Sequence, residues 1–112
     1  MRVHAYLGNG FQEVIYQRAL AIEMRKAGLS FARELDMIVH FYNEEIGTRR
    51  VDFFVENKVT VELKAVTKLD NSNLAQGLNY LKVYKIDKGL LINFGAPSLE
   101  VKRLRPPLIK NG

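Results

Sequence analysis

The sequence contains no cysteine, and this absence narrows its chemistry considerably. Disulfide bonds, thiolate zinc sites, iron–sulfur clusters and a cysteine nucleophile are all excluded. If the protein binds a metal ion, oxygen or imidazole ligands must therefore hold it.

Long hydrophobic runs are also missing. No apolar stretch approaches the roughly 20 residues that a membrane-spanning helix needs, and the first residues, MRVHAYLG, lack the apolar segment of a signal peptide. With 112 residues, 47% hydrophobic and 26% charged, the chain has the composition of one globular domain covering residues 1–112. We therefore expect a cytoplasmic protein that does not act at a membrane.

The charge balance is moderately basic, with 17 lysines and arginines against 12 acids and a net charge of +5. An excess of this size favours polyanionic partners electrostatically, but it is also a common means of keeping a protein in solution. Charge alone therefore does not identify a partner.

Two segments have the apolar periodicity of helices. The first covers residues 11–27 and carries a stripe at helical spacing, formed by Phe11, Val14, Ile15, Ala19 and Ile22. The second covers residues 70–84, and Asp70 or Ser72 is placed to cap its N-terminus. Gly77 lies inside this helix and costs about 1 kcal/mol against alanine, so we expect another group to pack closely there.

Four β-prone segments are separated by the helices or by turn signals, and they cover residues 31–42, 49–55, 59–66 and 89–94. Residues 43–47 and 56–58 read as turns, so the first three segments should form an antiparallel meander. The fourth, GLLINF, is apolar on both faces, as in a central strand covered on both sides. We interpret residues 102–105 as a basic C-terminal tail.

The third of these segments, VTVELKAV, carries an acid and a base in an otherwise apolar sequence. Because side chains alternate along a strand, Glu62 and Lys64 share one face. A three-residue loop at residues 56–58 would place Asp52 opposite Glu62 on that face. A two-residue loop would turn the two acids to opposite faces, unless a β-bulge intervenes.

Two carboxylates opposite each other repel, and a cation between them relieves that repulsion. Oxygen ligands of this kind suit Mg²⁺ or Mn²⁺. Lys64 adds a positive charge that can hold a water molecule or a phosphate oxygen. The combination of Asp52, Glu62 and Lys64 is typical of sites that cleave phosphodiesters.

These residues resemble a known signature. Asp52 followed by Glu62-Leu63-Lys64 resembles the D…(D/E)xK motif of the PD-(D/E)xK nuclease superfamily, and residues 10–16 (GFQEVIY) resemble the GxxExxY motif of one family within it. Gln76 and Tyr80 are similar to the QxxxY motif of its exonuclease-like branches. The resemblance covers nearly the whole chain and implies an α/β, restriction-endonuclease-like αβββαβ core, with a mixed central sheet flanked by helices.

The sequence departs from this family pattern at two places. Val51 stands where the proline of the motif name would precede Asp52. The chain also begins at what would be the last turn of the usual N-terminal helix, so we expect that helix to be truncated.

The resemblance implies a role for each motif residue. Glu13, Asp52, Glu62 and the carbonyl of Leu63 would hold Mg²⁺ or Mn²⁺, and Lys64 would orient the nucleophile. Asp52, Glu62 and Lys64 are thus the implied catalytic residues. The helical pair Gln76 and Tyr80 would contact the substrate or the groups around the metal.

Arg49 and Arg50 precede Asp52 and could bind substrate by steering phosphates toward it, although an exposed arginine pair at a turn is the commoner explanation. The function that we favour is a Mg²⁺-dependent nuclease acting on DNA rather than RNA. The alternatives are a nucleic-acid-binding module without turnover and an accessory interaction subunit, and neither needs the intact set of acids and lysine. We also expect a homodimer, with the apolar residues Val3, Tyr6 and Leu7 in or near its interface.

Overall fold

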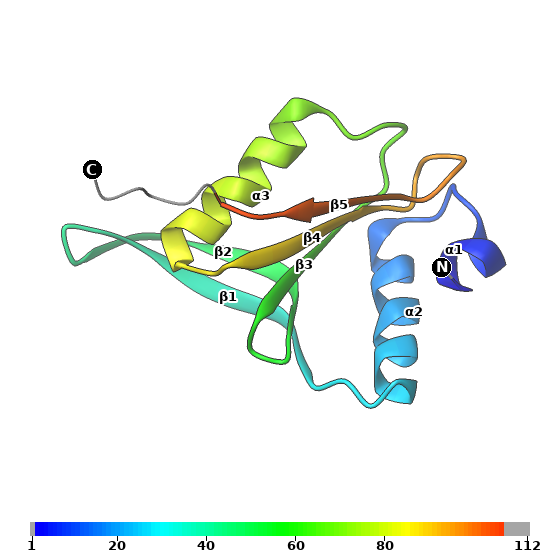
Figure 1. Ribbon diagram of the computed structural model, residues 1–112, viewed down its shortest axis with the longest axis horizontal. Helices are drawn as coiled ribbons and strands as arrows, with labels where there is room; N and C mark the ends of the chain where they lie inside the picture. The colour runs from blue at the N-terminus through cyan, green and yellow to red at the C-terminus, as the bar shows by residue number, and fades with distance from the viewer. Residues whose placement is uncertain (1, 107–112) are drawn as a thin grey trace.

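The computed structural model describes residues 2–106, which form one five-stranded sheet with packed helices (Figure 1). Along the chain the elements are α1 (Arg2–Leu7), α2 (Glu13–Lys26), β1 (Phe31–Phe41), β2 (Glu44–Val55), β3 (Val59–Lys64), α3 (Asn71–Tyr84), β4 (Lys88–Asn93) and β5 (Glu100–Leu104). No helix within residues 2–106 is long and apolar enough to cross a membrane.

The sheet has the strand order β1-β2-β3-β4-β5. Strands β1, β2 and β3 form the predicted antiparallel meander, while β3 and β4 run parallel and are connected through α3. The mixed sheet of the predicted αβββαβ core is therefore confirmed. Interpreting residues 102–105 as a tail was wrong, because β5 pairs antiparallel with β4. Its exposed basic residues, typical of an edge strand, hid the strand pattern.

The hairpin of β1 and β2 is longer than predicted. Its turn consists of Tyr42 and Asn43, both with positive φ (49° and 64°), rather than residues 43–47. A shift in register between Val39 and His40 accommodates Ile46, so the apparent turn sequence is part of β2. The end of this hairpin projects away from the helices (Figure 1).

The connection between β2 and β3 has the predicted three-residue loop. Val55 pairs with Val59 and Phe53 with Val61, which is the register that directs Asp52 toward Glu62. The ladder ends at the Phe53–Val61 pair, although β2 remains paired with β1 beyond this point. The two strands therefore separate at Asp52, and this separation is called the fork below.

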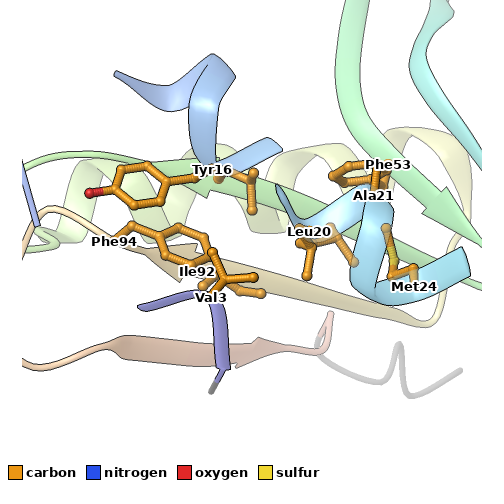
Figure 2. Close-up of a cluster of buried hydrophobic side chains, with 10 residues drawn as sticks. Val3, Tyr16, Leu20, Ala21, Met24, Phe53, Ile92 and Phe94 are labelled. Carbon is orange, nitrogen blue, oxygen red and sulfur yellow. The ribbon is translucent and has the colours of Figure 1, made fainter. Parts of the chain in front are cut away.

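Helix α2 packs on the sheet through Tyr16, Leu20 and Met24, which are one turn apart (Figure 2). The Tyr16 ring stacks on Phe94 with 4.6 Å between ring centroids. The predicted stripe was wrong, since Phe11, Val14 and Ile22 in that stripe are exposed. Apolar residues occupy more than one face of this helix, and periodicity alone does not choose between a face toward the sheet and a face toward α1.

On the other face of the sheet, α3 encloses a smaller cluster of buried leucines, formed by Leu69, Leu81, Leu91 and Leu104. The predicted cap is confirmed: the Asp70 side chain accepts a hydrogen bond from the Asn73 backbone N–H at 2.9 Å. The close packing expected at Gly77 is also confirmed, because an added Cβ there would collide with the side chain of Leu104.

Candidate active site

Asp52 occupies the fork between β2 and β3, and both of its carboxylate oxygens accept hydrogen bonds. Oδ2 accepts from the backbone N–H of Leu63 at 2.8 Å, and Oδ1 accepts from Nε2 of Gln17 at 2.9 Å. The Asp52 side chain thus binds a backbone N–H of β3 beyond the point where the ladder ends. These two bonds hold the carboxylate between α2 and β3.

Gln17 is a site residue that the sequence analysis missed. It is 6% exposed, so a polar side chain is buried on the face of α2 that packs against the sheet. It lies one helical turn after Glu13, and residues at this spacing share a helix face. The signal available in the sequence was a glutamine four residues after the motif glutamate.

Glu62 is an enclosed acid of the site, with a side chain that is 12% exposed. Burial raises the pKa of Glu62, and the Asp52 and Glu13 carboxylates raise it further, while Arg49 and Lys64 lower it. Charged groups of α2, β2 and β3 therefore act together on one carboxylate.

Glu13, at the first position of α2, belongs to the same group of charges. Burial raises its pKa, the Lys64 ammonium acts against this, and the Asp52 carboxylate adds to it. The fold thus brings the beginning of α2 close to the end of β3, although these residues are far apart in the sequence.

Arg49 lies between Glu62 and Tyr80. Its Nη2 is 3.6 Å from Oε2 of Glu62, and its guanidinium carbon is 3.8 Å from the centroid of the Tyr80 ring. Tyr80 is 4% exposed, and its hydroxyl has no hydrogen-bond partner within the described part of the chain. Burial raises the pKa of Tyr80, so its hydroxyl stays protonated and keeps a hydrogen to donate.

The other candidate residues lie at different distances from this group. Leu63 is buried against the α2 side of the sheet, next to Glu62 in β3. Gln76 is exposed on α3, one turn before Tyr80. Arg50 is exposed and paired with Asp36 of β1, with 2.9 Å from Nε to Oδ1. Because neighbouring side chains in a strand alternate, Arg50 and Arg49 point to opposite faces of β2.

The donor set fits a hard divalent cation in its chemistry. Asp52 and Glu62 supply carboxylate oxygens from neighbouring strands, and the Asp52 carboxylate raises the pKa of both Glu13 and Glu62. Within residues 2–106, however, no three His, Asp or Glu side chains are arranged closely enough to hold a metal ion. In this arrangement both carboxylate oxygens of Asp52 accept hydrogen bonds from protein donors, and Arg49 forms an ion pair with Glu62.

Comparisons with known proteins agree with this fold. The chain is similar to the solved structure titled "Crystal structure of SSO0001", with a TM-score of 0.66 and 16% sequence identity over 86% of this chain and 51% of that chain. This chain thus spans about half the length of that protein, and the likeness is one of fold. No curated protein matches the sequence. The model of the PD-(D/E)XK nuclease superfamily matches residues 1–104, which include every candidate site residue, so the chain belongs to that superfamily.

Proposed function

We propose that this domain is a nuclease that hydrolyses phosphodiester bonds of DNA with Mg²⁺ or Mn²⁺ as its cofactor. The observation that carries the proposal is the convergence of Asp52, Glu62 and Lys64 at the fork, where their charges act on one another and on Glu13. Nucleases of this superfamily generally use divalent metals, and membership in it implies a nucleic-acid substrate. The net charge of +5 favours the same class of partner.

In this proposal Asp52, Glu62 and the carbonyl oxygen of Leu63 hold the cation, and Glu13 contacts it directly or through water. When bound, such an ion supplies a positive charge that polarises the phosphate and acidifies a water molecule. Lys64 orients that water toward the phosphorus, since an ammonium donates hydrogen bonds and is no metal ligand. Gln17 keeps Asp52 in place through its hydrogen bond to Oδ1.

Substrate contacts in this proposal come from the α3 side of the site and from the hairpin. Arg49 lies next to Glu62 and over the Tyr80 ring, so in this proposal Arg49 contacts the phosphate that is cleaved and Tyr80 supports Arg49. Gln76 and Arg50 are exposed farther out, where they are available to flanking parts of a nucleic acid.

We also propose that the chain belongs to the GxxExxY family within the superfamily. The tyrosine of that motif, Tyr16, donates a hydrogen bond to the Gly8 carbonyl at 2.6 Å and accepts one from the Phe11 N–H at 3.2 Å. These bonds fix the loop that leads into α2, and Glu13 is the first residue of that helix. The motif tyrosine thereby positions the motif glutamate.

A DNA-binding module without turnover is the second candidate, and one observation favours it. Protein donors already bond both oxygens of Asp52, and Arg49 forms an ion pair with Glu62, so both acids have partners without a cation. A domain that only binds DNA could retain this arrangement.

Three measurements on the wild type and on Asp52→Ala test the proposal: the metal-induced shift in melting temperature, the cleavage of labelled DNA in Mg²⁺ or Mn²⁺, and DNA binding by fluorescence anisotropy. Asp36→Ala is the matched control, because Asp36 is an exposed acid that pairs with Arg50 on the hairpin. We expect cleavage and a metal-induced shift in the wild type and in Asp36→Ala, and neither in Asp52→Ala. Binding without cleavage and without a shift in the wild type would favour the second candidate.

We further propose a homodimer with the N-terminal segment at its interface. Of the three residues expected there, Tyr6 is 89% exposed, but Val3 is buried in the core and Leu7 packs against that core, so the expectation that Val3 is uncovered was wrong. Tyr6 and Ile22, which is 49% exposed, lie beside a groove of about 290 Å³ between α1 and α2. Burying such apolar side chains would stabilise an assembly. Light scattering at low and high salt tests this: a monomer in both conditions rejects the dimer, and a dimer lost only at high salt indicates charged contacts instead.

A further inference from the structure

We propose that Arg49 couples cation binding to substrate binding at the fork. Without substrate, Arg49 neutralises Glu62; when a nucleic acid binds, the guanidinium turns to a phosphate of the substrate and leaves Glu62 free for the cation. This inference rests on the proposed nuclease function, and it gives Arg49 a specific task within that function.

The contact between Arg49 and Glu62 is suited to being exchanged. At 3.6 Å from Nη2 to Oε2 it is an ion pair that lies beyond hydrogen-bond distance. The Arg49 side chain is 38% exposed, whereas the Glu62 side chain is only 12% exposed. Arg49 therefore holds the more accessible end of the pair, where an incoming phosphate can reach it.

Tyr80 provides the surface on which this exchange can occur. The guanidinium carbon lies 3.8 Å from the centre of a ring that is 4% exposed and anchored in α3. Attraction between a cation and a ring face does not require one particular edge of the guanidinium to point at Glu62. The group can therefore turn its N–H edge while its face stays on Tyr80, and a planar guanidinium edge matches the oxygens of a phosphate.

Electrostatics make the two binding events favour each other. Arg49 and a divalent cation compete for the Glu62 carboxylate, and two cations placed there also repel each other. A phosphate bound by Arg49 removes the competitor from Glu62. By linkage, the cation must then strengthen phosphate binding by the same factor.

Arg50 shows that the arrangement is specific to Arg49. It is the next residue, but it forms a hydrogen-bonded pair with Asp36 at 2.9 Å on the exposed surface of the hairpin. Such surface pairs contribute little and are not linked to a buried group. Within β2, only Arg49 joins an enclosed acid to an aromatic surface.

Mn²⁺ binding, followed by the EPR signal of the free ion, tests the inference without relying on catalysis. The titrations compare the wild type, Arg49→Met and Arg33→Met, each with and without saturating dimethyl phosphate, a simple phosphodiester. In Arg49→Met, the methionine keeps an unbranched side chain next to the Tyr80 ring but lacks the positive charge of the guanidinium. Arg33 is the matched control, since it is an exposed arginine on β1 near the fork. It lies opposite Phe53, and Phe53 forms the last pair of the β2–β3 ladder with Val61.

We expect dimethyl phosphate to tighten Mn²⁺ binding at least about fivefold in the wild type and in Arg33→Met, which is the range of ordinary coupling between sites. Without dimethyl phosphate, Arg49→Met should bind Mn²⁺ at least about fivefold more tightly than the wild type or Arg33→Met does. The increase in Mn²⁺ affinity that dimethyl phosphate causes in Arg49→Met should be at most about half of the increase in the other two proteins. Arg49→Lys keeps the charge but not the planar edge, and it should retain weak Mn²⁺ binding with reduced coupling.

Two results would overturn the inference in distinguishable ways. If the wild type binds Mn²⁺ but Arg49→Met matches Arg33→Met in affinity or in coupling, Arg49 is not the link and the nuclease proposal stands. If neither the wild type nor Arg49→Met binds Mn²⁺ with or without dimethyl phosphate, both proposals fail. Circular dichroism of each variant establishes that it is folded before titration.

Discussion

The apolar core under α2 and the charged site at the fork are built from adjacent residues of the same two strands, yet they bury opposite kinds of groups. Phe53 and Leu63 are buried in the apolar cluster that also contains Tyr16 and Phe94. Their neighbours in sequence, Asp52 and Glu62, are half-buried acids. Alternation along a strand lets one segment contribute to stability with one residue and to chemistry with the next.

The two regions also differ in what their burial does to the free energy of folding. Burying apolar side chains stabilises the fold. Burying Glu62 near Asp52 does the opposite, as its raised pKa indicates. The core therefore offsets the cost of a site whose charges are useful only when a ligand is bound, a trade-off common at functional sites.

The largest effect is expected at the site, from Lys64→Ala. Cleavage should fall by about 10²–10⁴-fold, the range for losing one group that positions or transfers a proton. Mn²⁺ binding should remain, because the lysine is no ligand and its removal relieves repulsion of the cation. Measurements of cleavage rate and Mn²⁺ affinity should include Lys58→Ala, an exposed turn residue, as the control. Normal cleavage by Lys64→Ala would make this lysine an ordinary surface residue.

In the core, Phe53→Ala should reduce the stability of the fold, in contrast to the loss of cleavage expected for Lys64→Ala. Loss of this fully buried ring, which packs edge to face on Phe31, should reduce the free energy of unfolding by about 3–5 kcal/mol. Phe54→Ala is the matched control, since Phe54 is only half-buried and should lose less than half as much. Urea denaturation measures both. Equal losses would mean that the core is not concentrated on the α2 side of β2.

Gln17 lies where the apolar core meets the charged site, because it is buried on α2 and bonds Asp52. The substitution Gln17→Leu should therefore affect metal binding without affecting stability. Metal affinity should fall by about 10–100-fold, as is typical when a group that orients a ligand is lost. Stability should change little, because leucine fills similar space among the apolar neighbours. Gln12→Leu is the control, as Gln12 is exposed before α2 and its side chain makes no capping bond. An unchanged metal affinity in Gln17→Leu would show that Asp52 needs no support.

The smallest effect is a pH dependence of stability in Glu62→Gln. The Glu62 pKa is raised above its ordinary value of 4.5 in the folded protein, so the unfolded state releases this proton at lower pH than the folded state does. The wild type therefore loses stability as pH rises from about that ordinary value through the raised pKa, and the glutamine variant does not.

In the absence of metal, Glu62→Gln should thus be more stable than the wild type at neutral pH, by less than the loss expected for Phe53→Ala. The difference should shrink as the pH is lowered toward 4.5. Thermal melts across this pH range measure it, and the same variant should lose Mn²⁺ binding and cleavage together. A glutamine variant less stable than the wild type at neutral pH would mean that the Arg49 pair outweighs the cost of burial.

Much of the fold followed from local sequence signals. Turn residues at 56–58 and strand alternation limited the β2–β3 register to a few possibilities, which included the observed three-residue loop, and Asp70 or Ser72 marked the beginning of α3. The face of α2 and the strand β5 could not be predicted in this way. Both depend on which partner covers an element, and local periodicity carries no information about that partner.

For the site, the sequence by itself determined which residues carry charge and at what spacing, and this singled out Asp52, Glu62 and Lys64, while Glu13 followed from the resemblance to the GxxExxY motif. Only the tertiary structure decided that β2 and β3 separate at Asp52, that Gln17 and the Leu63 N–H bind its oxygens, and that Arg49 lies between Glu62 and Tyr80. These contacts join residues from α2, β2, β3 and α3. The physical reason is that charge and alternation are properties of single residues and their neighbours, whereas burial and ion pairing depend on distances that only the packed chain defines.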